Sequence, residues 1–174
     1  SIGPHDTIRD LHEVANREFP SMLQEVLKHI SESIAMGAPM SIKQQAEDDA
    51  AYFPRRFADD GFIIWDLLTA AEAHNKIRAL TKPYPGAYSY YQGKKFFIQK
   101  SEMTRLPFYS EPGRIYQLRE SSFLVGAKDQ ALWIIEANYE NGDAVAPTLK
   151  RYDCFLNLRE LACKLMDSTH KIMS

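Results

Sequence analysis

The stretch IRALTKPYPGAYSYYQGKKFF, residues 77–97, changes its periodicity at its centre. Ahead of Pro83, apolar residues recur every three or four positions, which predicts a helix over residues 69–80. Pro83 ends this helix, and Gly86 supplies the backbone freedom that a tight turn needs. Beyond the turn the side chains alternate on both sides of Gln92-Gly93, as in a β-hairpin. The stretch therefore predicts the junction between a helix and a β-domain.

Strand-like segments follow one another through the second half of the chain. Turn residues separate five of them, over residues 87–92, 94–102, 113–118, 121–127 and 131–138. Five short antiparallel strands are typical of a small barrel or half-barrel of the oligonucleotide/oligosaccharide-binding (OB) type. A short strand or anchor is predicted at 62–65, and an amphipathic helix at 154–170. The predicted fold class is therefore α+β, with an OB-like antiparallel β-barrel and flanking helices.

The first residues predict helices. Asp6-Thr7 is a suitable helix start, because either side chain can accept a hydrogen bond from the free N–H groups of the first turn. Apolar residues at helical spacing then predict two consecutive helices within residues 7–36. Pro20 is expected in the first turn of the second helix, where its missing N–H is tolerated.

Residues 38–60 are mostly polar and show no regular periodicity. We expect them to form a linker that crosses the surface of the protein, where the side chains of Tyr52 and Phe53 anchor it. The linker divides the chain into residues 1–37 and a C-terminal domain, residues 61–174.

Composition and charge predict a soluble, cytoplasmic protein with no membrane partner. The 174 residues carry a formal net charge of −2, and no apolar run approaches the roughly 18 residues that span a bilayer. Dedicated nucleic-acid binders are usually strongly basic, so this balance argues against that class. Basic residues outnumber acidic ones between Lys82 and Lys128. Either solvated strand faces or a weakly positive surface that meets phosphates accounts for this excess.

Familiar catalytic motifs are absent from the sequence. It contains no Gly-x-Ser-x-Gly elbow, no Gly-rich phosphate loop and no cluster of metal ligands. His12 and His74 are interpreted as surface or capping histidines. Cys154 and Cys163 are interpreted as two buried thiols, because their spacing suits neither a zinc site nor a redox pair. The sequence therefore predicts no catalytic, cofactor-binding or metal-binding residue in this chain.

Aromatic and basic residues gather around the predicted hairpin. Such a mixture is typical of proteins on which single-stranded nucleic acid stacks. Alternation places Tyr88 and Tyr90 on one strand face and Tyr91 on the other, and one of these faces should belong to the core. The candidate ligand-binding surface comprises Tyr84, Lys82, Lys94, Lys95 and Lys100.

Three segments carry a resemblance to a known family. They are SIGPHDTIRDLHE (1–13), QQAEDDAAYFPRRFADDGFIIWD (44–66) and NKIRALTKPYPGAY (75–88). Together they resemble the formyltetrahydrofolate-dependent formyltransferases, which include methionyl-tRNA formyltransferase and the sugar-nucleotide N-formyltransferases. PGRIYQL (112–118) and FLVGAKDQALWIIEA (123–137) are similar to the barrel strands of that family. The resemblance therefore covers nearly the whole chain.

The resemblance implies that the chemistry lies outside this chain. The family carries an Asn-x-His pair and a later aspartate in an N-terminal Rossmann-like domain, where they move protons and stabilise the oxyanion. This sequence has no Asn-x-His, and Asp6 matches the helix-cap position of the family. Residues 1–37 then correspond to the last helices of the catalytic domain, and Arg78 is expected to tie its helix to the linker. The expectation is the C-terminal part of a formyltransferase, inactive alone.

The resemblance also implies the reactants. Formyltetrahydrofolate is the expected co-substrate of the parent enzyme, and this chain is expected to hold no cofactor. The expected acceptor is a primary amine, on an amino-sugar nucleotide or on methionyl-tRNA. Two alternatives stay open: a stand-alone module whose OB-like barrel binds nucleic acid or a sugar nucleotide, and a scaffold that dimerises through residues 154–170. A homodimer is also expected because the apolar faces within 7–36 need a covering surface.

Overall fold

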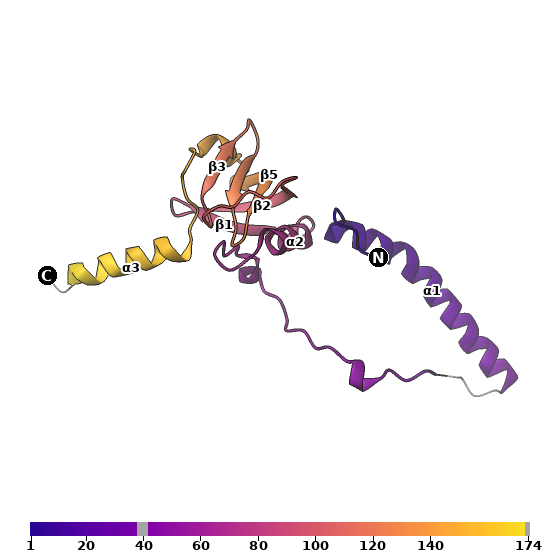
Figure 1. Cartoon of the computed structure of the whole chain (residues 1–174). Helices are drawn as coiled ribbons and strands as arrows, with labels where there is room; N and C mark the ends of the chain where they lie inside the picture. The colour runs from indigo at the N-terminus through magenta and orange to yellow at the C-terminus, as the bar shows by residue number, and fades with distance from the viewer. Residues whose placement is uncertain (38–41, 173–174) are drawn as a thin grey trace.

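The structure, a computed structural model, describes residues 1–37 and 42–172. In that part of the chain a five-stranded antiparallel sheet packs against the short helix α2 (Ala70–Leu80). Figure 1 shows the longer helices α1 (Ile8–Met36) and α3 (Leu158–Ile172) extending away from the sheet on opposite sides. The accessible surface is 12947 Å², whereas a compact monomer of this mass exposes about 8,700 Å². The excess comes from parts of the chain that do not pack on the sheet.

The sheet contains the five predicted strands, in the spatial order β1-β2-β5-β4-β3. All four neighbouring pairs are antiparallel. The predicted strand ends are correct to within two residues, and the α+β class is confirmed. The observed bounds are Ala87–Tyr91 (β1), Lys94–Met103 (β2), Ile115–Leu118 (β3), Phe123–Gly126 (β4) and Ala131–Tyr139 (β5).

The strand ladder is not continuous between β1 and β3 in residues 1–37 and 42–172, so closure of the sheet into the predicted OB-like barrel is not seen there. A loop segment, residues 152–156, reaches both edge regions instead. Phe155 N donates to Gly113 O at 2.9 Å, just before β3, and Leu156 N donates to Tyr90 O of β1 at 3.0 Å. The backbone groups of both edges therefore find partners without a continuous ladder.

The core is built around the aromatic ring of Phe155, which is fully buried. Its ring centroid lies 4.9 Å from Phe96, 5.5 Å from Phe123 and 5.9 Å from Trp65. The indole Nε1 of Trp65 donates to the buried Ser89 Oγ at 3.0 Å. The only polar atom of the Trp65 side chain is therefore satisfied inside the core.

The helix predicted over 69–80 is α2, and Thr69 is its N-cap. Thr69 Oγ1 accepts a bond from Glu72 N at 3.2 Å, and the Glu72 carboxylate accepts from Thr69 N in return. The predicted turn follows the helix. Gly86 has φ 105°, a backbone conformation that favours glycine, and a Cβ there would lie 2.6 Å from Gln99 Nε2, at the end of a flexible side chain.

One N-terminal helix is present where two were predicted, because α1 runs through Pro20 without a break (Figure 1). The predicted start is correct, with Thr7 as the N-cap. Pro20 lacks the N–H that would bond to the carbonyl of Asn16, and residues 16–20 are exposed, so water can take that bond. No residue of α1, all of which the structure describes, is buried. Its apolar stripe is exposed, including Phe19, Leu23, Val26, Leu27 and Ile34.

The linker is not pinned as predicted. Tyr52 and Phe53 are 87% and 83% exposed. Residues 42–57 are irregular apart from one short turn of 3₁₀-helix, Glu47–Asp49, while residues 38–41 of the predicted linker lie outside the described residues. The anchor predicted after the linker is present as one parallel bridge between Phe62 and Tyr88.

The last helix begins at Leu158, four residues later than predicted. The residues just before it are occupied by bonds to the sheet edges, and Cys154 forms a bridge with Arg114. The Asn157 side-chain oxygen then accepts a bond from Glu160 N at 2.7 Å, as an N-cap does.

A buried tyrosine holds the segment that carries Phe155. The Tyr91 hydroxyl donates a short hydrogen bond to the Asp153 carboxylate, which also accepts from Lys150 N at 3.0 Å. Burial, and next this hydrogen bond, raise the pKa of Tyr91 to about 12. The neutral phenol is therefore the form that the folded state favours.

Phe155→Ala is expected to lower the free energy of unfolding by about 3–5 kcal/mol, because it empties the centre of the core. Urea denaturation followed by tryptophan fluorescence measures this change. The matched control is Phe53→Ala, which removes the same atoms from an exposed ring and should change stability by less than about 0.5 kcal/mol. Similar effects of the two substitutions would contradict the central position of Phe155.

Stability is expected to fall as the pH rises from about 10 to about 12. An unfolded tyrosine loses its proton near pH 10, whereas the folded Tyr91 holds it to about pH 12. The folded state binds more protons in this window, so the free energy of unfolding decreases with pH. Urea midpoints across the window measure the slope, and Tyr91→Phe should flatten it. An unchanged slope in that variant would argue against the Tyr91–Asp153 bond.

Candidate functional site

A cleft of about 560 Å³ lies on the described part of the chain. Four parts of the chain line it: residues 5–9 around the start of α1, one side of α2 with the turn after it, the middle of β2, and Glu136 of β5. These parts are far apart in sequence and meet because α2 packs on β2 while the N-terminal segment rests on α2. The cleft is therefore a product of tertiary structure.

Arg78 builds one wall of the cleft. Its Nη1 donates to Asp6 O at 2.7 Å and to Gly3 O at 3.0 Å, and its Nε donates to Asn75 Oδ1 at 2.9 Å. The prediction that Arg78 ties its helix to the linker is thus wrong, since it binds the N-terminal segment instead. A planar guanidinium can bridge two carbonyls because its donors are fixed in a fork.

His74 forms a second link between α2 and its neighbours. His74 Nδ1 lies 2.9 Å from Ser101 Oγ, and Nε2 lies 3.4 Å from Pro4 O. Ser101 is 6% exposed, so its hydroxyl depends on this contact. His74, interpreted from the sequence as a surface or capping residue, joins β2 to the N-terminal segment. His12 is also half-buried, with its ring centroid 5.9 Å from that of Tyr84.

The cleft carries an excess of positive charge. Four cationic side chains line it, against the two carboxylates Glu102 and Glu136, which leaves a formal excess of two with the histidines neutral. Within the part of the chain that the structure describes, no hydrogen bond or ion pair engages three of the cations: Arg9, Lys82 and Lys100. These three side chains are available to an anion.

The residues predicted to form one ligand-binding surface lie in two separate places in the structure. Lys82 and Lys100 line the cleft. Tyr84 lies beside it, against His12. Lys94 and Lys95 flank the β1–β2 turn, and the Lys95 ammonium lies 4.0 Å from the ring centroid of Tyr88.

The tyrosine faces are correctly predicted. Tyr91 faces the core next to Phe155, at 6.0 Å between ring centroids. Tyr88 and Tyr90 lie on the other face, and both contact the Phe62 ring. Tyr88 is only 6% exposed. Its ring is thus covered by neighbours and offers little area for stacking a base.

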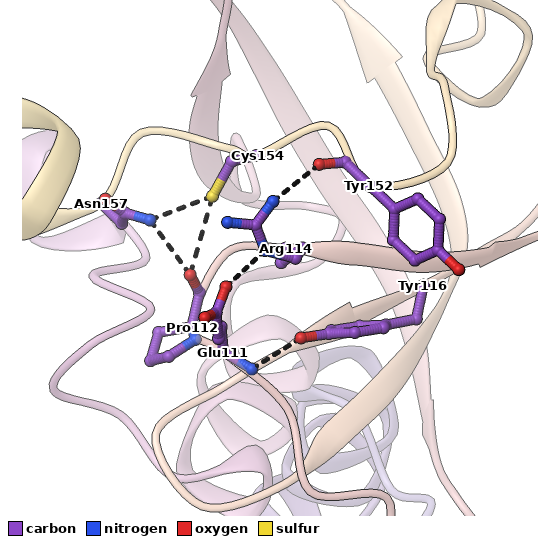
Figure 2. Close-up of polar contacts among 7 residues, drawn as sticks. All are labelled: Glu111, Pro112, Arg114, Tyr116, Tyr152, Cys154 and Asn157. Atoms are coloured by element: carbon purple, nitrogen blue, oxygen red, sulfur yellow. Dashed lines mark hydrogen bonds and ion pairs between the residues drawn. The ribbon is translucent and has the colours of Figure 1, made fainter.

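A second polar cluster lies at the start of β3, as Figure 2 shows. Arg114 bonds to the Glu111 carboxylate and, at 3.0 Å, to Tyr152 O, while Asn157 Nδ2 lies 3.0 Å from Cys154 Sγ (Figure 2). Burial raises the pKa of the Cys154 thiol to about 11, which keeps it protonated and unreactive at neutral pH. The cluster therefore holds loops together. Of the two thiols predicted to be buried, Cys154 is partly buried and Cys163 is exposed.

Neither a metal site nor a membrane-spanning helix is found among residues 1–37 and 42–172. No group of three or more His, Cys, Asp or Glu side chains there is arranged to hold a metal ion. No helix there is long and apolar enough to cross a bilayer.

The sequence did not indicate the N-terminal wall of the cleft. It singled out Lys82 and Lys100 through the local excess of basic residues. It missed Arg9, because a single arginine on an amphipathic helix carries no signal of its own. The docking of residues 3–7 onto Arg78 is a contact across more than 70 positions, and no pattern within a short window indicates such a contact.

Arg78→Ala is expected to release the N-terminal segment from α2, because it removes two charge-assisted bonds to backbone carbonyls. Backbone order parameters measured by NMR for residues 3–7 should fall from about 0.85 to below about 0.6, while those of the strands stay unchanged. Arg105→Ala, an exposed arginine in the loop after β2, is the control. Residues 3–7 that stay rigid in Arg78→Ala would show that other contacts hold them.

Parts of this chain are similar to known proteins. The sequence model of the family "Formyl transferase, C-terminal domain" matches residues 57–150. The bifunctional polymyxin resistance protein ArnA of Wigglesworthia glossinidia brevipalpis is 37% identical over 107 residues, which cover 58% of this chain. That match covers only 16% of the length of ArnA.

Solved structures of HypX from Aquifex aeolicus are also similar. One variant of HypX matches 82% of this chain and 23% of its own, at 18% identity and a TM-score of 0.47. HypX in complex with tetrahydrofolic acid matches 63% of this chain and 18% of its own, at 20% identity and a TM-score of 0.46.

The family match includes the end of the linker, α2 and all five strands of the sheet. It spans 94 of the 174 residues, more than half of the chain. The resemblance that the sequence suggested is confirmed, and the chain belongs to the family of formyl transferase C-terminal domains.

Proposed function

We propose that this chain is the C-terminal part of an enzyme that moves a formyl group from formyltetrahydrofolate to a primary amine. The match of residues 57–150 to the formyl transferase C-terminal domain carries the proposal. The ArnA relative supports it, since the matched region of ArnA is also a small part of a longer protein. The α2–sheet unit described above is the part of the proposed enzyme that the family match covers.

The proposed chemistry belongs to residues outside the printed sequence. Formyl transfer to an amine needs a base for the amine proton and a donor for the developing oxyanion. The sequence contains no Asn-x-His pair for these tasks. The described residues contribute a folded β-domain and a cationic cleft, which are suited to positioning an acceptor.

The proposed acceptor is a small amine that carries phosphate, such as an amino-sugar nucleotide. A methionyl-tRNA acceptor would need many phosphate contacts and a strongly basic surface. The net charge of −2 and the two carboxylates in the cleft disfavour such a surface. The three available cations suit one phosphate or diphosphate group.

A formyl-transfer assay on the complete product of the gene tests the proposal. The product is incubated with 10-formyltetrahydrofolate and either a UDP-amino sugar or methionyl-tRNA, and the formation of tetrahydrofolate is followed. Turnover is expected with the amino sugar, and none is expected for residues 1–174 alone. Lys82→Ala in the complete product should raise the KM for the acceptor about tenfold at little change in kcat, as loss of one charge-assisted contact does.

Two results would contradict the proposal. Failure of the complete product to formylate any amine would exclude the activity. Turnover with methionyl-tRNA alone would replace the proposed acceptor.

A further inference from the structure

We infer that the cleft between residues 5–9, α2 and β2 binds a small phosphate-bearing molecule through Arg9, Lys82 and Lys100. The inference rests on the proposed function, because it gives the phosphate of the proposed acceptor a place on this domain. The site is assembled by residues on both sides of the linker, from the first turn of α1 to β2.

Three cationic side chains in the lining of the cleft are unpaired within the described residues. Arg9 lies in the first turn of α1, Lys82 in the turn after α2, and Lys100 on β2. None of them is engaged in a hydrogen bond or ion pair within the described residues, although all three line one cleft. Like charges at one place repel each other, and a bound phosphate would replace this repulsion by attraction.

The fourth cation of the cleft, Arg78, is bonded to groups of the protein itself. All of its described bonds go to Gly3 O, Asp6 O and Asn75 Oδ1. Arg78 is therefore a positioning residue that holds the N-terminal wall of the cleft. Arg9 is then the lining arginine whose guanidinium is available to bind a phosphate bidentately. Arg78 thus serves to fix the N-terminal wall of the cleft, and a fixed wall is useful if a bound ligand contacts it.

The volume and the lining of the cleft indicate the kind of ligand. A volume of about 560 Å³ lies within the range typical of small-molecule sites. Glu102 and Glu136 share the lining with the cations, and they would repel the closely spaced phosphates of a nucleic acid. The same carboxylates can accept hydrogen bonds from hydroxyl groups. The lining thus suits one phosphate group attached to a hydroxyl-bearing body, as in a sugar phosphate.

Isothermal titration calorimetry on the full chain, residues 1–174, tests the inference with three probes. Ribose 5-phosphate represents the ligand class, ribose lacks the phosphate, and a ten-residue thymidine oligonucleotide represents nucleic acid. Binding is expected for ribose 5-phosphate and not for ribose at the same concentration. The double substitution Lys82→Ala with Lys100→Ala should weaken binding at least about tenfold, since each lysine contributes a charge-assisted contact.

The matched control is Lys43→Ala with Lys128→Ala. It removes the same two charges from exposed positions outside the lining and should change the affinity less than about twofold. Arg78→Lys, which keeps the charge but loses the fork, should weaken binding while circular dichroism shows an intact fold.

Several outcomes would overturn the inference. These are equal losses in the two double variants, equal binding of ribose and ribose 5-phosphate, binding of the oligonucleotide alone, or no binding of any probe. The result is separable from the proposed function. Phosphate binding without formyl transfer by the complete gene product would contradict only the function, and transfer without phosphate binding would contradict only this site.

Discussion

The insertion of Phe155 between the two edges of an open sheet is the contact on which the β-domain depends. Its ring fills the space among Trp65, Phe96 and Phe123, while its backbone and that of Leu156 bond to the two edge regions. A five-stranded sheet that does not close by its own ladder leaves two sets of unpaired groups. One loop satisfies groups on both edges and supplies the ring that lies among Trp65, Phe96 and Phe123 in the core, so the order of the C-terminal segment and that of the sheet are inseparable. The bonds from Tyr91 and Lys150 to Asp153 hold this loop in place.

Arg78 has the corresponding role for the cleft. The sheet and α2 are ordered by apolar burial, but the N-terminal segment has few apolar contacts with them, and α1 has no buried residue within the described chain. The segment is held chiefly by polar bonds from Arg78 and His74 to three of its carbonyls. Such bonds are directional, so they set where α1 begins and which way it leaves the domain. The position of Arg9, and with it the composition of the cleft, follows from that placement.

The sequence was sufficient for elements whose signals are local. Alternating strands, the helix over residues 69–80 and the glycine turn at Gly86 each depend on residues within a few positions, and all three are found. Predictions that depended on what a segment touches were less successful. Pro20 was read as a boundary, yet an exposed helix tolerates it, and Arg78 was assigned the wrong partner. The chemistry of Lys82 and Lys100 was indicated by composition, but the cleft that unites them with Arg9 depends on contacts between distant residues. Only the folded chain specifies those contacts.

The proposed phosphate site and the docking of α1 are then coupled by thermodynamics. Arg9 follows directly on residues 3–7, which Arg78 and His74 hold, so a ligand that contacts Arg9 together with Lys82 would bind the docked form more tightly than a released one. A ligand with that preference stabilises docking by RT ln(1 + [L]/Kd), about 2.7 kcal/mol at a hundredfold excess over Kd. A bond network of two or three polar contacts is of similar strength. An acceptor that occupies the cleft would thus reinforce the geometry between α1 and the β-domain, and release of the product would relax it. In an enzyme whose catalytic groups lie beyond this domain, such coupling would link the orientation of the two parts to the presence of the acceptor.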